Sequence, residues 1–258
     1  MQDIVSLQGG GEERYEVLLR YRGEDGKLVP PGAFLPPAER FGLSPKLDRW
    51  VIEEACRHLA GNPDSAARLS INLSGLSIAD DELLPFVRLT LERYAVPASR
   101  LCFEITETAA ITNLDNATRF IRDMKAVGCC FALDDFGSGL SSFGYLKNLP
   151  VDVLKIDGIF VRDIVSDELD RAMVRSINDI GQLLGKKTIA EFVENDEIAA
   201  ILRNLGVDYG QGYGIARPRP IEEVLPEVAT GDGRQVAVGL RPAASDQPAS
   251  LLRLARNA

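Results

Sequence analysis

Short apolar runs alternate with longer segments of helical periodicity along most of the chain. The apolar runs lie at residues 4–7, 14–21, 69–73, 101–105, 129–133, 151–156, 187–190 and 207–209. The segments with apolar residues at helical spacing lie at residues 31–41, 44–60, 81–94, 113–127, 161–184, 196–205 and 221–228. Strands that alternate with helices pair in parallel, so about eight of them in one α/β unit predict a modified TIM (β/α)8 barrel.

Two regions depart from this alternation. The first two apolar runs are separated by Gly9-Gly10-Gly11, which predicts a hairpin and one antiparallel strand near the N-terminus. No GK[ST] sequence follows these glycines, so a turn is favoured over a phosphate-binding loop. From Thr230 onwards small, polar and proline residues replace the periodic pattern. We therefore expect one domain over residues 1–229 and a flexible tail over residues 230–258.

The segment 161–184 predicts the longest helix. Its apolar residues include Leu169, Met173, Ile177, Ile180 and Leu184. This spacing is typical of one buried helix face.

Charge and hydropathy exclude some classes of function. The net charge is −9 and no basic stripe is present, so we expect no binding to duplex nucleic acid. The chain has no apolar run of about 18 residues and no signal-peptide pattern at Met1, so we expect no membrane contact by this segment. We expect a cytoplasmic location, either free or as the cytoplasmic part of a membrane-anchored protein.

Cysteine and histidine offer little for a soft-metal site. The four cysteines show no CxxC spacing, and Cys102, Cys129 and Cys130 lie in apolar runs, which favours buried structural thiols in a reducing cytosol. The only histidine is His58, which we expect to cap its helix or to be solvated. One histidine cannot form a histidine-rich zinc site.

Polar residues recur where the apolar runs end. They are Glu16, Asn72, Glu104, Asp134 with Asp135, Lys155 with Asp157, Glu191 and Gln211. A single Glu or Asn at a strand end is usually a helix cap or a solvated residue. In a barrel, however, the carboxyl ends of the strands meet at one mouth, where catalytic groups lie. An oxygen-rich set with one lysine and no histidine predicts a site for magnesium, calcium or manganese.

The stretch around Asp134 and Asp135 carries the strongest local signal. Two adjacent carboxylates at the end of a buried strand are unfavourable unless they share a cation. Two cations sharing Asp134 would polarise a phosphoryl oxygen and lower the pKa of a water. Lys155 would hold that water, and Glu191 would accept its proton or bind the second cation. These roles predict metal-assisted hydrolysis of a phosphoester.

Two other patterns also match these residues. Asp135-Phe136-Gly137 matches the DFG triplet of protein kinases, but no HRD loop precedes it. Lys155 could form a Schiff base, as in barrel aldolases, but this would leave the acidic strand ends without a purpose.

Longer motifs make the chain similar to the EAL-domain family of bacterial cyclic di-GMP phosphodiesterases. The motifs are Glu16-Val-Leu-Leu-Arg20, Asn72-Leu-Ser74, Glu104-Ile-Thr-Glu107, Asp134-Asp-Phe-Gly-Ser-Gly139, Lys155-Ile-Asp157, Ala190-Glu-Phe-Val-Glu194 and Gln211-Gly-Tyr213, in the family's order. The resemblance implies a modified TIM barrel that hydrolyses cyclic di-(3′,5′)-GMP to linear pGpG. It also implies two Mg²⁺ or Mn²⁺ ions per site and a role in lowering the second messenger.

The resemblance implies a role for each matched residue. The metal ligands would be Glu16, Asn72, Glu104, Asp134, Asp135 and Glu191, with Asp134 bridging both ions. Lys155, Glu191 and Asp135 would be catalytic, holding the nucleophilic water and assisting proton removal. The substrate would contact Leu19, Arg20, Asp157 and Gln211, with Arg20 gripping a phosphate. The loop after Asp135 would be stabilised by Glu107, Gly137, Gly139 and Glu194.

A few positions depart from the family pattern. The signature triplet is Glu-Val-Leu instead of Glu-Ala-Leu, and Val17 alternates away from Glu16 on a strand, so we expect a small effect. Ser138 replaces the commoner threonine and keeps a hydroxyl. Family members usually carry a helix and part of a strand before residues 2–7. This implies an N-terminally truncated domain, with sensory or GGDEF domains upstream in the full-length protein.

Two functions follow from the resemblance. The first is an active phosphodiesterase, and the alternative is a non-catalytic receptor that only binds cyclic di-GMP. The chain keeps every matched ligand and the lysine, which favours the enzyme. The resemblance also implies a homodimer through residues 141–149 and the following helix, although that helix could simply pack on the barrel.

Overall fold

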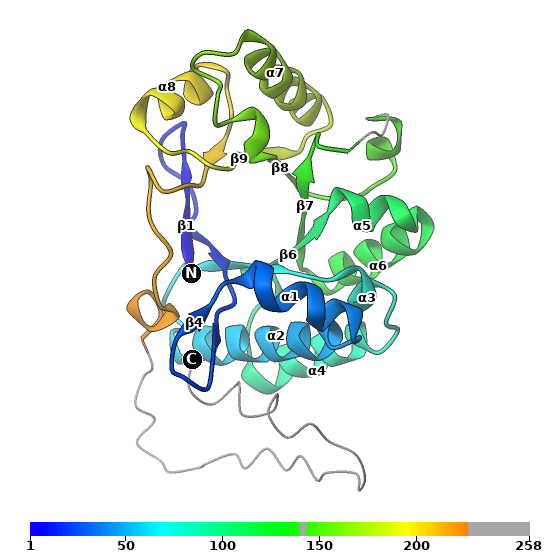
Figure 1. Cartoon of the computed structure of the whole chain (residues 1–258). Helices are drawn as coiled ribbons and strands as arrows, with labels where there is room; N and C mark the ends of the chain where they lie inside the picture. The colour runs from blue at the N-terminus through cyan, green and yellow to red at the C-terminus, as the bar shows by residue number, and fades with distance from the viewer. Residues whose placement is uncertain (140–142, 227–258) are drawn as a thin grey trace, which may run out of the picture.

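Eight strands close into a barrel in the computed structural model, which describes residues 1–139 and 143–226. Around the barrel their order is β1-β10-β9-β8-β7-β6-β5-β2. They are β1 (Gln2–Ser6), β2 (Arg14–Val17), β5 (Arg68–Asn72), β6 (Leu101–Thr106), β7 (Cys130–Phe136), β8 (Val153–Ile156), β9 (Lys187–Ala190) and β10 (Tyr209–Gly210). Figure 1 shows helices arranged around the outside of this ring. The predicted α/β barrel is confirmed.

Strand β1 is the irregular member of the barrel. It pairs antiparallel with β10 and with β2, where Gln2 lies opposite Glu16, while the other neighbours in the barrel are parallel. The turn after β1 contains Gly9, Gly10 and Gly11, all at positive φ, a conformation that other residues rarely adopt. The predicted hairpin and its antiparallel strand are therefore confirmed.

Helices α1, α2, α4, α6 and α8 begin close to the predicted positions, α7 begins later than predicted, and the short α3 and α5 were not predicted. They are α1 (Pro31–Arg40), α2 (Ser44–Gly61), α3 (Gly75–Ile78), α4 (Leu83–Tyr94), α5 (Glu107–Thr112), α6 (Leu114–Val127), α7 (Glu168–Leu183) and α8 (Asp196–Asn204). Short 3₁₀ turns are η1 (Ala98–Arg100), η2 (Phe143–Lys147), η3 (Gly158–Phe160) and η4 (Ile221–Glu223). Asn113, Asp167 and Asn195 cap α6, α7 and α8, since their side chains accept hydrogen bonds from backbone N–H groups of the first turn.

Alternation along the strands separates an inner from an outer layer. On β6, Leu101, Phe103 and Ile105 belong to the large buried cluster that the strands share with the helices. A second, smaller cluster contains the intervening Cys102 and comprises Ile4, Cys102, Ala132, Val153, Ile189 and Tyr209 from different strands. Because side chains alternate along a strand, the next position on the Cys102 face is Glu104. The barrel interior is thus apolar at one level and polar at the next.

The buried face predicted for residues 161–184 is only partly correct, since Ile177 is buried and Met173 and Ile180 are half-buried, and the longest helix is α2 instead. Helix α7 begins at Glu168 and buries Val174, Ile177, Asn178 and Gly181. Leu169 is 70% exposed and Leu184 is 36% exposed. Polar Asn178 can be buried because its amide donates to the Leu205 carbonyl and accepts from the Thr188 hydroxyl. The hydropathy pattern of the sequence cannot predict a buried polar residue of this kind.

Three smaller predictions also need correction. The run predicted over residues 14–21 ends as β2 at Val17, and Tyr21–Arg22 (β3) instead pairs with Leu28–Val29 (β4) in a separate sheet. Of the helix predicted over 221–228, the described part holds only η4, and residues 227 and 228 lie outside the described ranges. His58 neither caps a helix nor meets solvent: it is 4% exposed, and its Nδ1 lies 3.2 Å from the Leu225 carbonyl.

The cysteines match their predicted structural role. All four are free, and Cys56, Cys102 and Cys129 are buried while Cys130 is half-buried. In the part of the chain that the structure describes, no helix is both long and apolar enough to traverse a lipid bilayer. The tail predicted over residues 230–258 lies outside the described residues.

Candidate active site

The polar strand ends converge on one mouth of the barrel. Each lies at or just after the carboxyl end of a different strand: Glu16 on β2, Asn72 on β5, Glu104 on β6, Asp134 on β7, Lys155 on β8, Glu191 after β9 and Gln211 after β10. The register of the sheet places Asn72 directly opposite Glu104. The predicted convergence is therefore observed.

Lys155 lies at the centre of the cluster and is fully buried. Its Nζ forms ion pairs with oxygens of Glu104 at 2.7 Å, Glu191 at 2.8 Å, Asp134 at 3.0 Å and Glu16 at 3.5 Å. Burial alone would lower the pKa of this lysine, but the surrounding carboxylates raise it well above its ordinary value. Lys155 is thus a permanent cation that orients four acidic side chains.

Glu16 is held by several donors. Asn72 Nδ2 lies 2.7 Å from Glu16 Oε1, and Gln211 Nε2 lies 2.5 Å from Oε2. Burial would raise the pKa of Glu16, but Lys155, Gln211 and Asn72 together hold it below its ordinary value. Gln211 Nε2 also lies 3.2 Å from Gln2 Oε1, which adds Gln2 to the residues around the site. The sequence carried no motif that pointed to Gln2.

Three other carboxylates of the cluster have raised pKa values. Burial, assisted by neighbouring carboxylates, raises the pKa of Glu104 to about 8, of Glu191 to about 7 and of Asp135 to about 6. When all are ionised, Lys155 offsets only one of the five carboxylates Glu16, Glu104, Asp134, Asp135 and Glu191. Two divalent cations would offset the remaining four negative charges.

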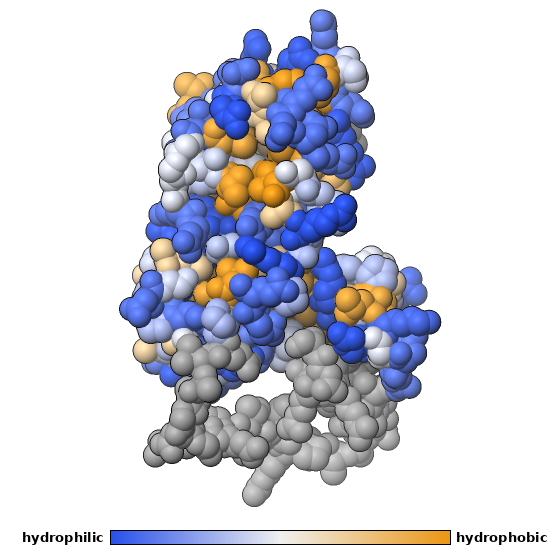
Figure 2. All heavy atoms as spheres, turned by 90° about the vertical axis from the view of Figure 1, so that its left-hand side faces the viewer, coloured by the Kyte–Doolittle hydropathy of each residue, from blue (hydrophilic) through white to orange (hydrophobic). Residues whose placement is uncertain are grey.

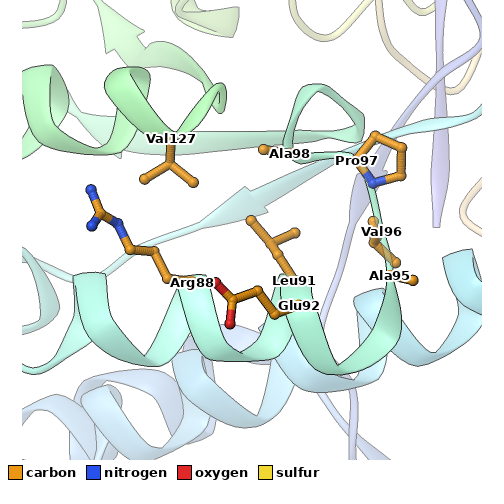
Figure 3. A pocket seen from close by; sticks show the side chains of 8 residues that line it. All are labelled: Arg88, Leu91, Glu92, Ala95, Val96, Pro97, Ala98 and Val127. Carbon is orange, nitrogen blue, oxygen red and sulfur yellow. The ribbon is translucent and has the colours of Figure 1, made fainter.

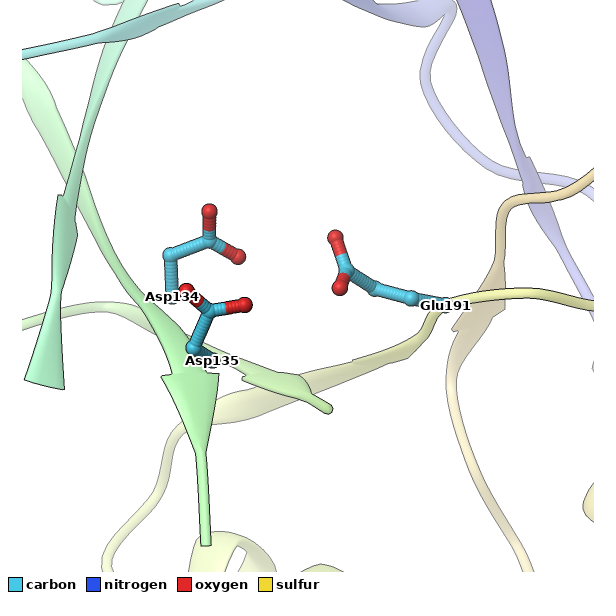
Figure 4. Close-up of side chains that lie close together, drawn as sticks. All are labelled: Asp134, Asp135 and Glu191. Atoms are coloured by element: carbon cyan, nitrogen blue, oxygen red, sulfur yellow. The ribbon is translucent and has the colours of Figure 1, made fainter. Parts of the chain in front are cut away.

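The residues present fit such a cation. Oxygens of Asp134, Asp135 and Glu191 lie within 4.8 Å of one another, and Figure 4 shows the three side chains pointing toward a common space. Glu104 Oε1 and Asp134 Oδ1 are buried without a hydrogen bond; Asp134 Oδ1 approaches Lys155, but not in hydrogen-bonding geometry. Buried oxygens without donors and an all-oxygen set suit magnesium, manganese or calcium.

A bulge allows both aspartates to face the mouth. Regular alternation would turn Asp135 away from Asp134. The register between β7 and β8 shifts between Leu133 and Phe136, and Asp135 has φ of 53°. Phe192, next to Glu191, also has φ of 53°. Such strained non-glycine residues cluster at functional sites, and here Asp135 belongs to the acidic cluster and Phe192 follows Glu191 just after β9.

Glu107 contacts the segment that follows Asp135. It is 2% exposed, and its carboxylate accepts hydrogen bonds from the Gly137 N–H at 2.9 Å and from the Tyr145 hydroxyl at 2.7 Å. A Cβ added at Gly139 would lie 3.2 Å from Glu107 Cδ. The structure thus brings three of the predicted loop residues together and adds Tyr145. Glu194 is different: it is exposed, and its side chain forms no hydrogen bond or ion pair within residues 1–139 and 143–226.

The residues predicted to contact substrate lie around the mouth. Leu19 and Arg20 are half-buried after β2, and Arg20 Nη1 donates to the Leu19 carbonyl at 2.9 Å. Asp157 follows β8 and accepts a hydrogen bond from the Ile159 N–H at 3.0 Å. Its negative charge contributes to the raised pKa of Asp135, after burial and Asp134. No contact links Arg20 to the acidic cluster among the described residues.

An open groove of about 430 Å³ lies away from these residues, between α4 and α6 (Figure 3). It is lined by Arg88, Leu91, Glu92, Ala95, Val96, Pro97, Ala98 and Val127. Ala98 and Val127 precede the amino ends of β6 and β7. The groove is therefore at the opposite end of the barrel from the acidic cluster and contains none of its residues.

Comparisons with known proteins agree on one family. The EAL domain family matches residues 2–218. Cyclic di-GMP phosphodiesterase PdeB of Shewanella oneidensis is 41% identical over 220 residues, covering 84% of this chain and 26% of that protein. Cyclic di-GMP phosphodiesterase PdeF of Escherichia coli is 41% identical over 229 residues, covering 88% of this chain and 30% of that protein. The chain thus spans less than a third of the length of these relatives.

Solved structures show the same fold. The PaMucR phosphodiesterase in complex with c-di-GMP has 36% identity and a TM-score of 0.80, with 87% of this chain and 92% of that chain covered. The FimX EAL domain from Pseudomonas aeruginosa bound to c-di-GMP has 34% identity and a TM-score of 0.79, with 84% and 88% covered.

Proposed function

We propose, from the premise that the chain belongs to the EAL-domain family, that it hydrolyses cyclic di-GMP to linear pGpG. The observation that carries the proposal is the oxygen-rich cluster around Lys155, in which several strand ends supply acidic or amide side chains. Relatives named cyclic di-GMP phosphodiesterases support the reaction, and structures with c-di-GMP support the ligand.

We propose that two Mg²⁺ or Mn²⁺ ions are held by Glu16, Asn72, Glu104, Asp134, Asp135 and Glu191. When bound, such ions polarise a phosphoryl oxygen and lower the pKa of a water. Because the Asn72 amide nitrogen donates to Glu16, its oxygen stays available as a ligand. Asp134 Oδ1 lies 3.0 Å from Lys155 Nζ, and an Asp134 oxygen lies within 4.8 Å of oxygens of Asp135 and Glu191, which suits a residue shared by both ions.

The protein side chains supply positioning and proton transfer. Lys155 fixes the carboxylates and would donate a hydrogen bond to the attacking water. The pKa of Glu191, about 7, suits a group that accepts a proton near neutral pH. Arg20 would bind a substrate phosphate through its planar guanidinium, and Leu19, Asp157 and Gln211 would contact the rest of the nucleotide.

A chromatographic assay tests this proposal. The protein is incubated with cyclic di-GMP and Mg²⁺, and we expect pGpG to accumulate with time and to be suppressed by EDTA. Binding of cyclic di-GMP is measured in parallel by calorimetry. Tight binding of cyclic di-GMP without formation of pGpG in the dimeric protein would contradict the proposed enzymatic activity. The alternative, a non-catalytic cyclic di-GMP receptor, would then be favoured.

A homodimer through residues 141–149 and α7 remains part of the proposal. Helix α7 carries an apolar stripe that the barrel does not cover, with Leu169 70% exposed and Leu183 87% exposed. Residues 140–142 lie outside the described ranges, so the support comes from α7 alone. The length of the curated relatives supports further domains in the full protein, for which we propose sensory or GGDEF modules.

A further inference from the structure

We propose that Tyr145 is a positioning residue of this site, whose hydroxyl orients Glu107 and so holds the backbone that carries Asp134 and Asp135. The kinetic part of this inference rests on the proposed function, whereas its structural part does not. Tyr145 would touch neither substrate nor cation and would act through Glu107.

The first step is the contact between Tyr145 and Glu107. Each oxygen of the buried Glu107 carboxylate has its own donor: the Tyr145 hydroxyl on Oε1 and the Gly137 N–H on Oε2. A buried carboxylate is strongly unfavourable unless such donors are present. Charge-assisted bonds of this kind are also stronger than neutral ones. The Tyr145 hydroxyl therefore fixes the orientation of the Glu107 carboxylate, which accepts the hydrogen bond from the Gly137 N–H.

The second step links Gly137 to the aspartates. Asp135 has φ of 53°, a strained conformation that persists only where the surroundings enforce it. Gly137 has φ of 99°, and a Cβ there would lie 2.8 Å from Ile177 Cδ1 and 3.1 Å from Phe160. The backbone after Asp135 is thus confined by α7 on one side and held by Glu107 through the Gly137 N–H.

The third step is the rigidity of Tyr145 itself. The next residue in η2, Leu146, is fully buried, and Leu149 is 1% exposed. The N–H groups of Asn148 and Leu149 donate to the Tyr145 carbonyl at 2.9 and 3.2 Å. Burial and the Glu107 carboxylate raise the pKa of Tyr145, so its hydroxyl remains a proton donor across the working pH range. The Tyr145 hydroxyl is thus a donor on a well-packed turn, and such a fixed donor can position Glu107.

The test is Tyr145→Phe, which keeps the ring and removes only the hydroxyl. Tyr94→Phe is the matched control, because the Tyr94 hydroxyl donates to Glu53 at 3.3 Å from α4 to α2. Three quantities are measured: Mn²⁺ affinity by electron paramagnetic resonance, exchange of the Gly137 amide proton by NMR in the metal-free protein, and kcat and KM for cyclic di-GMP. Circular dichroism verifies folding of both variants.

We expect Tyr145→Phe to weaken Mn²⁺ binding about tenfold, to accelerate Gly137 exchange about tenfold, and to lower kcat more than it changes KM. In a Glu107→Ala background the same change should add nothing. Tyr94→Phe should match the wild type in all three quantities.

Unchanged Mn²⁺ affinity and Gly137 exchange in folded Tyr145→Phe would overturn the inference, whatever the catalytic result. If the wild type binds Mn²⁺ but hydrolyses no cyclic di-GMP, the proposed function fails instead. Tyr145 is then judged on Mn²⁺ affinity and amide exchange alone.

Discussion

At the scale of single residues, the site is organised by the carboxylates that surround Lys155. The alternation of side chains along a strand makes most of these site residues predictable. Glu104, Asp134 and Lys155 each lie two positions after an inward-facing apolar residue of the same strand. Contacts between distant residues were not predictable in the same way. Tyr145 and Glu107 are 38 positions apart, and His58 and Leu225 are 167 apart, and neither pair carries a periodic signal.

Glu191→Ala should abolish turnover while leaving cyclic di-GMP binding largely intact. Loss of a group that accepts a proton typically slows a reaction by about 10²–10⁴-fold. Glu197→Ala is the control, because Glu197 is an exposed residue at the start of α8. Turnover is measured by chromatography and binding by calorimetry. Unchanged turnover in Glu191→Ala would remove Glu191 from the mechanism.

The buried thiols predict a loss of stability at high pH. Burial raises the pKa of Cys56 and of Cys129 to about 12, whereas an unfolded thiol has a pKa of about 8.5. Between these values the folded protein keeps protons that the unfolded chain releases, so the free energy of unfolding should fall as pH rises through this window. Below about pH 8.5 this stabilisation is fully present.

Urea unfolding at pH 7.5 and pH 10 measures this effect. The decline in the free energy of unfolding between the two pH values should be smaller in Cys56→Ala than in the wild type. An equal decline in both proteins would contradict the assignment to Cys56.

At the scale of elements, the local deviations rather than the regular strands shape the site. The hydropathy pattern predicts the barrel and its order of strands and helices, because each strand buries an apolar run and each helix buries one apolar face. The bulge in β7 depends on the pairing register between β7 and β8. The periodicity of hydrophobic residues within β7 does not predict this register. The pattern of apolar residues placed only part of the buried face of α7 correctly, because that face also includes Asn178, whose side chain is hydrogen-bonded.

Gly137→Ala tests the close packing of β7 against α7. The new Cβ would meet Ile177 at 2.8 Å, at a φ of 99° that alanine rarely adopts. We expect a loss of about 1–3 kcal/mol in the free energy of unfolding and reduced turnover. Gly32→Ala is the control, since Gly32 lies in α1 with open space around its Cα and no positive φ. Equal stability of Gly137→Ala and the wild type would contradict the packing described.

At the scale of the whole molecule, the uncovered stripe of α7 predicts self-association. Leu169→Glu combined with Leu183→Glu should convert a dimer to a monomer in analytical ultracentrifugation, because both leucines are exposed in the single chain. Leu89→Glu is the control, since Leu89 is 62% exposed on α4. A double variant that remains dimeric would exclude this stripe as the interface.

Hydrolysis transfers an oxygen atom from water to the product, which oxygen-isotope labelling detects. The protein is incubated with cyclic di-GMP and Mg²⁺ in ¹⁸O-water, and the masses of the products are measured by mass spectrometry. The account predicts pGpG that carries one ¹⁸O in its terminal phosphate. Unlabelled product, or bound cyclic di-GMP that stays intact, would contradict it.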